Sequence, residues 1–234
     1  MTESKFIEDL KNLEINITDK QLIQLNKYYE LLKEWNEKIN LTSIIEKDQV
    51  YLKHFYDSLT LSKVYDFNKN IKICDIGTGA GFPGIVLKIM FPNVKIVLVD
   101  ALMKRINFLN LVIEKLKLEN IIAIHERMED YAYKHEEEFD IITARAVSNL
   151  PTLLEISAKS LKQKGKMLFL KGDIKEELLL SNNAIRLLNL NIEKVEEFLL
   201  PIENSKRSIV VIEKVGKTPN KYPRKFSDIK KKPL

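Results

Sequence analysis

The stretch that decides the fold runs from Ile73 to Gly84 and reads ICDIGTGAGFPG. Gly77, Gly79, Gly81 and Gly84 all fall in this stretch, although the whole chain of 234 residues contains only 7 glycines. Glycine permits tight turns and close approach of another group to the backbone. The stretch follows a β-like run and opens a helix-like one, so it predicts a turn that either reverses sharply or holds a ligand near the helix N-terminus.

Short β-rich runs alternate with amphipathic runs around this turn. The β-rich runs are 71–76, 94–99, 121–124, 140–143 and 166–170, and the helix-like runs are 83–91, 104–118 and 151–161. Such alternation predicts βαβ units and an α/β fold with a doubly wound, mostly parallel sheet. A further helix from 175 to about 190 precedes two β-like runs, 192–200 and 208–215, which would add as an antiparallel edge hairpin.

The first 65 residues have a different pattern, with apolar residues at helical spacing after a capping box from Thr18 to Gln21. The chain therefore divides into a helical lead-in (1–65), a ligand-binding α/β domain (66–215) and a basic tail (216–234).

The end of the chain is strongly basic. From Lys214 onward there are eight basic residues and one acidic residue, Asp228, which gives a net charge of +7. The total charge of the chain is +5, so the rest of the chain carries −2. Such a tail suits a nucleic-acid backbone, or it is a solvated end.

Several classes are excluded by composition. The single cysteine, Cys74, permits no intrachain disulfide and no multi-cysteine metal site, and the three histidines lack metal-ligand spacing. His54 and Asp57, three residues apart on a predicted helix, are interpreted as a structural hydrogen-bonding pair. The N-terminus is charged and no apolar run is long enough to span a bilayer. We therefore expect a soluble cytoplasmic protein without a bound metal or a membrane partner.

Two cofactors fit the glycine-rich turn. Gly79, Gly81 and Gly84 followed by Asp100 match the dinucleotide fingerprint. Alternatively, Asp75 at the end of the first strand, the glycines at alternate positions and Asp100 at the end of the second strand are typical of S-adenosylmethionine (SAM) enzymes. A carboxylate at the strand end would repel a pyrophosphate but favour a cofactor with an ammonium and a sulfonium. The pattern favours SAM over a nicotinamide cofactor and over a turn that binds nothing.

The methyl acceptor is narrowed by what the sequence lacks. The fourth strand is followed by Thr143 to Val147, TARAV, and not by the Pro-Pro motif common in enzymes that methylate exocyclic amines. Cys74 lies inside the first strand, where it cannot serve as the nucleophile that pyrimidine C5 methylation needs. A ring nitrogen such as guanine N7 has a free lone pair, so it needs alignment and no general base. No catalytic residue is then obligatory. The absence of an obvious catalytic set would also be expected of a binding protein.

Three cations follow successive strands: Arg127, Arg145 and Lys171 come at the ends of the third, fourth and fifth. The carboxyl ends of parallel strands form the ligand-binding edge of such a sheet. We assign these side chains to guanine O6, to phosphate or to a cofactor carboxylate. Surface salt bridges are the alternative for each of them.

With these residues, the chain resembles the ribosomal RNA small subunit methyltransferase G family, also called glucose-inhibited division protein B, over nearly its whole length. The Phe-Pro-Gly that ends the glycine stretch is more specific than the glycines themselves. The other matching residues are Trp35-Asn36, Asn40-Leu41-Thr42, His54, Asp57-Ser58-Leu59, Asp100, Lys104-Arg105, Phe108-Leu109, Arg127-Met128-Glu129, Ala144-Arg145-Ala146, Leu170-Lys171-Gly172 and Tyr222-Pro223-Arg224.

The resemblance implies a Rossmann-like enzyme that uses SAM to methylate N7 of the guanine at conventional position 527, in the 530 loop of 16S rRNA. It implies that Gly77 and Phe82 line the cofactor, that Met128 and Glu129 flank its adenine and that Arg145 contributes to the same site. We add Gly79 and Asp100 to the cofactor set, and Arg127 and Lys171 to the substrate set. The expected partner is 16S rRNA or a precursor of the small subunit, bound by a monomer. The alternatives are a non-catalytic RNA-binding or ribosome-assembly factor and, third, a nicotinamide-dependent oxidoreductase.

Overall fold

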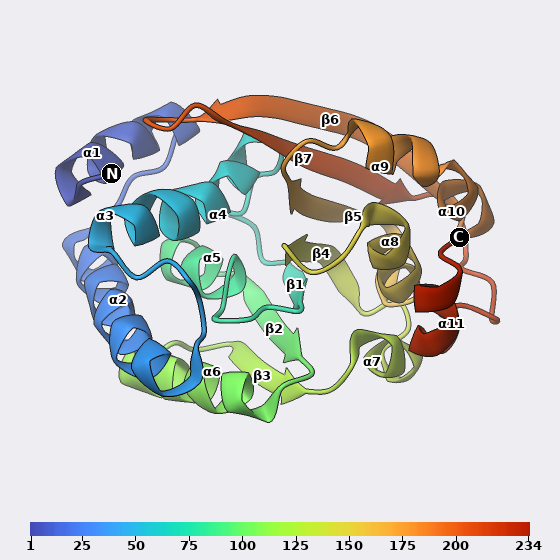
Figure 1. The fold of residues 1–234 in the computed structure, drawn as a ribbon, viewed down its shortest axis with the longest axis horizontal. Coiled ribbons are helices and arrows are strands. Elements are labelled where there is room, and N and C mark those ends of the chain that lie inside the picture. The colour runs from blue at the N-terminus through green and yellow to red at the C-terminus, as the bar shows by residue number, and fades with distance from the viewer.

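The computed structural model describes residues 1–234 and contains one seven-stranded sheet between two layers of helices (Figure 1). The strand order is β3-β2-β1-β4-β5-β7-β6. The first five strands pair in parallel, and β6 and β7 add as an antiparallel hairpin at one edge. The strands are β1 Lys72–Ile76, β2 Lys95–Asp100, β3 Ile121–His125, β4 Phe139–Arg145, β5 Leu161–Lys171, β6 Leu190–Leu200 and β7 Ser205–Lys214. The predicted doubly wound sheet with its edge hairpin is confirmed.

Each face of the sheet buries its own apolar core. Helices α5 (Gly84–Met90) and α6 (Met103–Lys115) share one core with the N-terminal helices and with strand residues such as Ile73. The neighbouring Cys74 points to the opposite core, with α7 (Met128–Lys134), α8 (Leu150–Ala158) and α10 (Asn182–Leu187). Because successive side chains of a strand point to opposite faces, one apolar strand supplies both cores.

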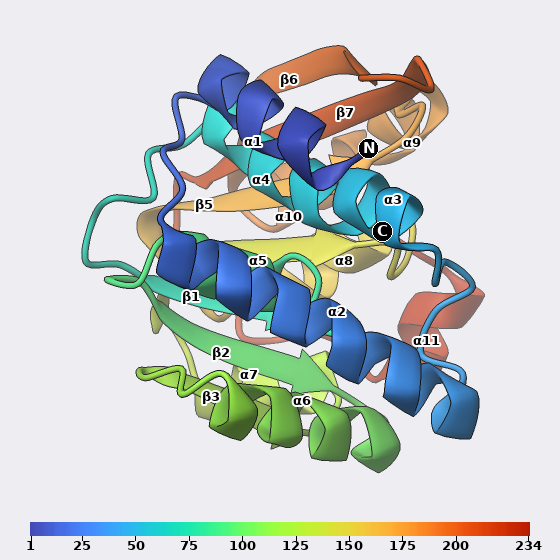
Figure 2. The same ribbon diagram turned by 90° about the vertical axis from the view of Figure 1, so that its left-hand side faces the viewer.

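The N-terminal helices lie on the sheet. They are α1 (Glu3–Leu10), α2 (Asp19–Ile39), α3 (Lys47–Val50) and α4 (Asp57–Leu59), with a π-helical segment, Tyr51–Tyr56, joining the last two. Figure 2 shows α2 running along the outside of the molecule beside α5 and α6. The predicted capping box is present, since the Thr18 hydroxyl accepts from the Gln21 N–H and the Gln21 side chain accepts from the Thr18 N–H. None of these helices combines the length and the hydrophobicity of a membrane-spanning helix, and the same holds for the rest of the structure.

Two helices differ from the sequence prediction. The seven-residue α7 was not predicted, because it is shorter than the window of roughly 11 to 18 residues over which helical periodicity is judged. The helix expected from 175 to about 190 is two helices, α9 (Lys175–Leu180) and α10, which meet at Ser181. The Ser181 hydroxyl donates to the Glu177 carbonyl at 2.6 Å, a local bond that competes with continuous helix geometry.

The basic tail packs against α7 and α8 (Figure 1). Tyr222 and Ile229, the latter on α11 (Phe226–Lys231), are buried in the core of that face. Arg224 donates from Nε and Nη2 to the fully buried carboxylate of Glu155 on α8, at 2.8 and 2.7 Å. Lys214, at the end of β7, is buried too and donates to two backbone carbonyls. Two of the eight basic residues are therefore structural, and the others remain at the surface.

We expect Arg224→Ala to lower the free energy of unfolding by about 3 kcal/mol, because it leaves the Glu155 carboxylate buried without its charged partner. Urea denaturation followed by circular dichroism measures this change. Lys230→Ala, which removes an exposed cation from the same tail, is the matched control and should change stability by less than about 0.5 kcal/mol. Equal effects of the two substitutions would contradict a tail anchored by Arg224.

Candidate cofactor and acceptor sites

The glycine-rich turn between β1 and α5 needs its glycines for two reasons. Gly77, Gly79 and Gly81 have φ of +59°, +62° and +100°, a conformation that other residues rarely adopt. A Cβ on Gly81 would lie 2.5 Å from the Ile85 side chain and 2.8 Å from the Tyr28 hydroxyl oxygen. A Cβ on Gly79 would have no neighbour closer than 3.9 Å. The backbone at Gly79 therefore faces open space, as the approach of a ligand requires.

Asp75, the last polar residue of β1, is buried under this turn. Its Oδ2 accepts from the Thr78 hydroxyl at 2.6 Å and from the Gly84 N–H at 2.9 Å, so it fixes both ends of the turn. Its Oδ1 is buried and has no hydrogen-bond partner. Burial raises the pKa of the Asp75 carboxyl to about 7, against the effect of the two donors. An acceptor without a partner at this position fits a ligand that carries an ammonium group.

Asp100, at the end of β2, ties the second strand to the same turn. Its Oδ2 accepts from the Gly79 N–H at 3.0 Å and from Arg105 at 3.1 Å, and its Oδ1 accepts from the Leu102 N–H at 2.9 Å. The carboxylate is thus an organiser of the glycine-rich turn. Its assignment to the cofactor set stays a prediction, and a contact with the cofactor would use the lone pairs that these bonds leave free.

Met128 and Glu129 begin α7, next to the end of β3, and both are buried. Burial raises the pKa of the Glu129 carboxyl. Arg127 precedes them, with Nη1 3.9 Å from Glu129 and its guanidinium over the ring of Phe226 in the tail. Arg127 therefore belongs to the half of the sheet edge that carries Asp100, Met128 and Glu129.

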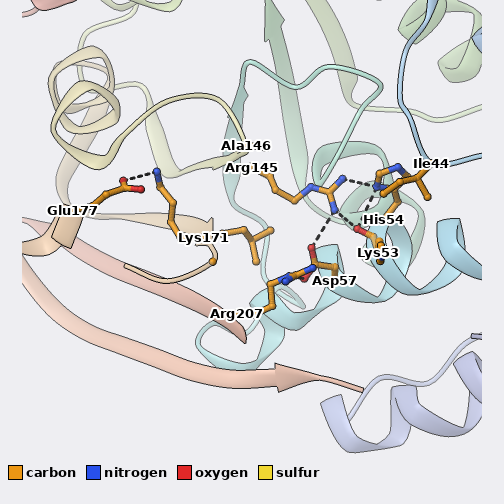
Figure 3. Close-up of a pocket in the computed structure, with 11 residues that line it drawn as sticks. Ile44, Lys53, His54, Asp57, Arg145, Ala146, Lys171, Glu177 and Arg207 are labelled. Carbon is orange, nitrogen blue, oxygen red and sulfur yellow. Dashed lines mark hydrogen bonds and ion pairs between the residues drawn. The ribbon is translucent and has the colours of Figure 1, made fainter. Parts of the chain in front are cut away.

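A cavity of about 450 Å³ opens on the other half of the edge, beside the glycine-rich turn (Figure 3). This volume is within the range of small-molecule sites, about 300 to 1,000 Å³. Its residues come from the N-terminal helical segment, from the ends of β4 and β5, from α9 and from β7: Ile44, Lys53, His54, Asp57, Arg145, Ala146, Leu170, Lys171, Gly172, Glu177 and Arg207. Of the three cations predicted at the strand ends, Arg145 and Lys171 line this cavity and Arg127 does not.

Arg145 is the centre of this cavity's polar network. Its Nη1 donates to the Lys53 carbonyl at 2.6 Å and to Asp57 Oδ2 at 3.3 Å, and its guanidinium lies over the Phe82 ring, 5.0 Å from the centroid. Asp57 Oδ1 accepts from Arg207 Nε at 3.0 Å. One buried carboxylate is thus shared by two arginines from different strands. Arg145 connects the cavity to the glycine-rich turn through Phe82.

His54 is kept neutral by its surroundings. Burial, and secondarily the Arg145 charge, lower its pKa to about 3. Nδ1 lies 3.0 Å from Arg145 Nη2, which can only donate, and 3.2 Å from the Lys53 carbonyl, which can only accept, while Nε2 lies 3.0 Å from the Thr42 hydroxyl. The predicted pair of His54 with Asp57 is indirect, since each side chain contacts Arg145 and they do not contact one another.

Five polar residues were not predicted to line the cavity: Lys53, His54, Asp57, Glu177 and Arg207. Three of them lie within one helical segment, while Glu177 and Arg207 are more than 100 residues further along the chain. Glu177 Oε2 accepts from Lys171 Nζ at 2.8 Å and from the Leu150 N–H at 2.6 Å. No group of three or more His, Cys, Asp or Glu side chains in the structure is placed to hold a metal ion.

The mostly parallel sheet, its antiparallel edge hairpin and a glycine-rich turn flanked by two buried aspartates define a Rossmann-like methyltransferase that uses SAM. Solved structures share the fold: a SAM-dependent methyltransferase from Aquifex aeolicus (TM-score 0.56, 17% identity, covering 75% of this chain and 97% of that one) and Aeropyrum pernix fibrillarin with bound SAM (TM-score 0.51, 16% identity, 67% and 73%). At such identities they show the fold alone.

Sequence comparison gives the family. The model of the family GidB, rRNA small subunit methyltransferase G, matches residues 21–210. The ribosomal RNA small subunit methyltransferases G of Oceanobacillus iheyensis and Bacillus subtilis are 46% and 45% identical to this chain over its full length, and 100% and 99% of their lengths are covered. The chain belongs to the rRNA small subunit methyltransferase G family. The predicted family, fold class and SAM-dependent methyltransferase class are confirmed.

Gly79→Val tests the cofactor half of the edge. We expect SAM affinity to fall by more than 100-fold, because the side chain would fill the open space above the turn, while the fold is retained at a cost of about 1 to 2 kcal/mol for the left-handed backbone. Titration calorimetry with SAM and thermal unfolding measure the two effects. Gly172→Ala, at a glycine with no atom within 4 Å of the added Cβ, is the control for SAM affinity. A folded Gly79→Val variant with wild-type affinity would exclude this site.

The raised pKa of Asp75 predicts a pH dependence of stability. Between pH 4 and 7 the folded, SAM-free protein holds a proton on Asp75 that the unfolded chain has lost, so the free energy of unfolding falls as pH rises, by on the order of 1 kcal/mol per unit. Asp75→Asn should lack this component. Urea denaturation of both proteins from pH 4.5 to 8 gives the difference. Parallel pH profiles would show that Asp75 is ionised in the folded protein throughout this range.

Proposed function

We propose that this protein transfers a methyl group from SAM to N7 of the guanine at conventional position 527 of 16S rRNA, in the 530 loop. One observation carries the proposal: a cavity of nucleotide size, lined by cations, lies at the end of β4 next to the glycine-rich turn. The membership in the methyltransferase G family supports small-subunit rRNA as the substrate.

The cofactor occupies the half of the sheet edge formed by β1, β2, β3 and the start of α7. Gly77, Gly79, Phe82, Asp100, Met128, Glu129 and Arg145 are its proposed contacts. Asp75 Oδ1, the buried acceptor without a partner, is available to its ammonium group. When bound, SAM supplies a methyl group whose bond to the sulfonium sulfur breaks as a bond to N7 forms, which leaves a neutral thioether and a cationic guanine ring.

The acceptor guanine occupies the cavity, where its N7 must be aligned and water excluded. N7 carries a lone pair and no proton, so the residues around it need not remove one. The two side chains near the turn that could act as a general base, His54 and Asp57, are not available to remove a proton. His54 is neutral with both ring nitrogens engaged, and each oxygen of Asp57 already accepts from an arginine. Lys171 in the cavity and Arg127 outside it are the proposed RNA contacts.

Further features of the proposal concern the partner and the compartment. The net charge of +5 favours association with RNA. We propose that the substrate is 16S rRNA, free or in a precursor of the small subunit, that the protein acts as a monomer and that it acts in the cytoplasm.

Mapping of 7-methylguanine in 16S rRNA tests this function. RNA from a strain that lacks the protein should lose one signal when it is cleaved chemically at 7-methylguanine and analysed by primer extension. The wild-type gene on a plasmid should restore the signal, and a Gly79→Val gene should not. An unchanged modification map in the deletion strain would overturn the proposal.

A further inference from the structure

Lys171 and Glu177 form a donor and acceptor pair on one side of the cavity, and the function above does not explain it. Lys171 ends β5, and Glu177 lies on α9 just beyond the turn that follows. Figure 3 shows the pair apart from the group of Arg145, His54 and Asp57. Each side chain has unused hydrogen-bonding capacity. Lys171 Nζ donates to the Ser148 carbonyl at 2.5 Å and to Glu177 Oε2, which leaves its third hydrogen free.

Glu177 is the cavity carboxylate with a free oxygen. Its Oε2 is held by Lys171 and by the Leu150 N–H, while Oε1 has no partner in the protein. Asp57 is different, because both of its oxygens bond arginines. The bonds at Oε2 fix the orientation of the Glu177 side chain. Its free Oε1 is therefore an acceptor held in place beside an ammonium donor.

An enzyme that methylates guanine N7 must reject adenine, which has an equivalent N7 acceptor. The two bases differ along their Watson–Crick edges. Guanine presents an acceptor, O6, followed by two donors, N1–H and N2–H₂, whereas adenine presents a donor, N6–H₂, followed by the acceptor N1. An ammonium beside a carboxylate matches the guanine order and opposes the adenine order. RNA bases that are unstacked are commonly read by such edge contacts.

We propose that the Lys171–Glu177 pair reads the Watson–Crick edge of the target guanine. Glu177 Oε1 accepts from N1–H and N2–H₂, and Lys171 Nζ donates to O6. N7 lies on the Hoogsteen edge, which adjoins O6, so a base held by Glu177 at N1–H and N2–H₂ turns N7 away from Glu177 and toward the side of the cavity next to the glycine-rich turn. The inference rests on the proposed function and adds the residues that select guanine.

Inosine provides a direct test, because it differs from guanosine only by lacking the N2 amino group. Small subunits are reconstituted with 16S rRNA that carries guanosine, inosine or adenosine at the target position, and single-turnover methyl transfer from radiolabelled SAM is measured. We expect the wild-type protein to methylate guanosine at least tenfold faster than inosine, since a hydrogen bond to a charged acceptor is lost. Adenosine should show no measurable transfer.

Glu177→Gln is the informative variant. Its amide oxygen can still accept from Leu150, so the start of α8 is kept, but its NH₂ group would face the N1–H donor. The guanosine to inosine rate ratio should fall to within about threefold of one, with SAM affinity unchanged by calorimetry. Glu176→Gln, an exposed change of the same charge on the same helix, should keep the wild-type ratio.

The outcomes separate this inference from the function on which it rests. If the wild-type protein methylates neither guanosine nor inosine, the proposed function fails. If it methylates guanosine but does not distinguish inosine, or if Glu177→Gln keeps the wild-type ratio, reading by Glu177 is overturned. A purely structural role of Glu177 predicts equal losses on both substrates and hence an unchanged ratio.

Discussion

The site depends on one buried carboxylate that two arginines share. Asp57, from the N-terminal helical segment, accepts from Arg145 at the end of β4 and from Arg207 on β7. A buried carboxylate is stable only with such partners, and each arginine in turn needs the carboxylate. The three side chains therefore fix the position of the helical segment over two strands of the sheet. All three side chains line the cavity, so this contact forms part of its wall.

The N-terminal helices are also part of the cofactor half. The buried Tyr28 hydroxyl on α2 donates to the Ala80 carbonyl of the glycine-rich turn, and the Tyr28 ring packs against Phe82. Phe82 is stacked on His54 and lies under the Arg145 guanidinium. The glycines permit the positive φ values of the turn, and these contacts hold it in place. The lead-in thus shapes both the turn and the cavity next to it.

The fold could be predicted because its signals are local. Strand and helix order follow from short apolar runs and from one glycine-rich turn, and the strand ends place Arg145 and Lys171 at a common edge. The cavity could not be predicted, because Lys53, Asp57, Glu177 and Arg207 meet only through tertiary contacts. The spacing of His54 and Asp57 predicted a direct pair, yet both side chains turn to Arg145, 88 or more residues further along the chain.

The basic tail shows where charge counting stops being informative. Its composition fits an RNA-binding arm and a solvated end equally well, because a net charge says nothing about which cations are buried. Tyr222 and Ile229 pack the tail onto the domain. Their burial brings Arg224 to Glu155 and Phe226 to Arg127. Arg127 directly precedes Met128 and Glu129. The tail is therefore packed beside the start of α7, and the structure connects it to the cofactor half of the edge by direct contact, whatever its exposed lysines bind.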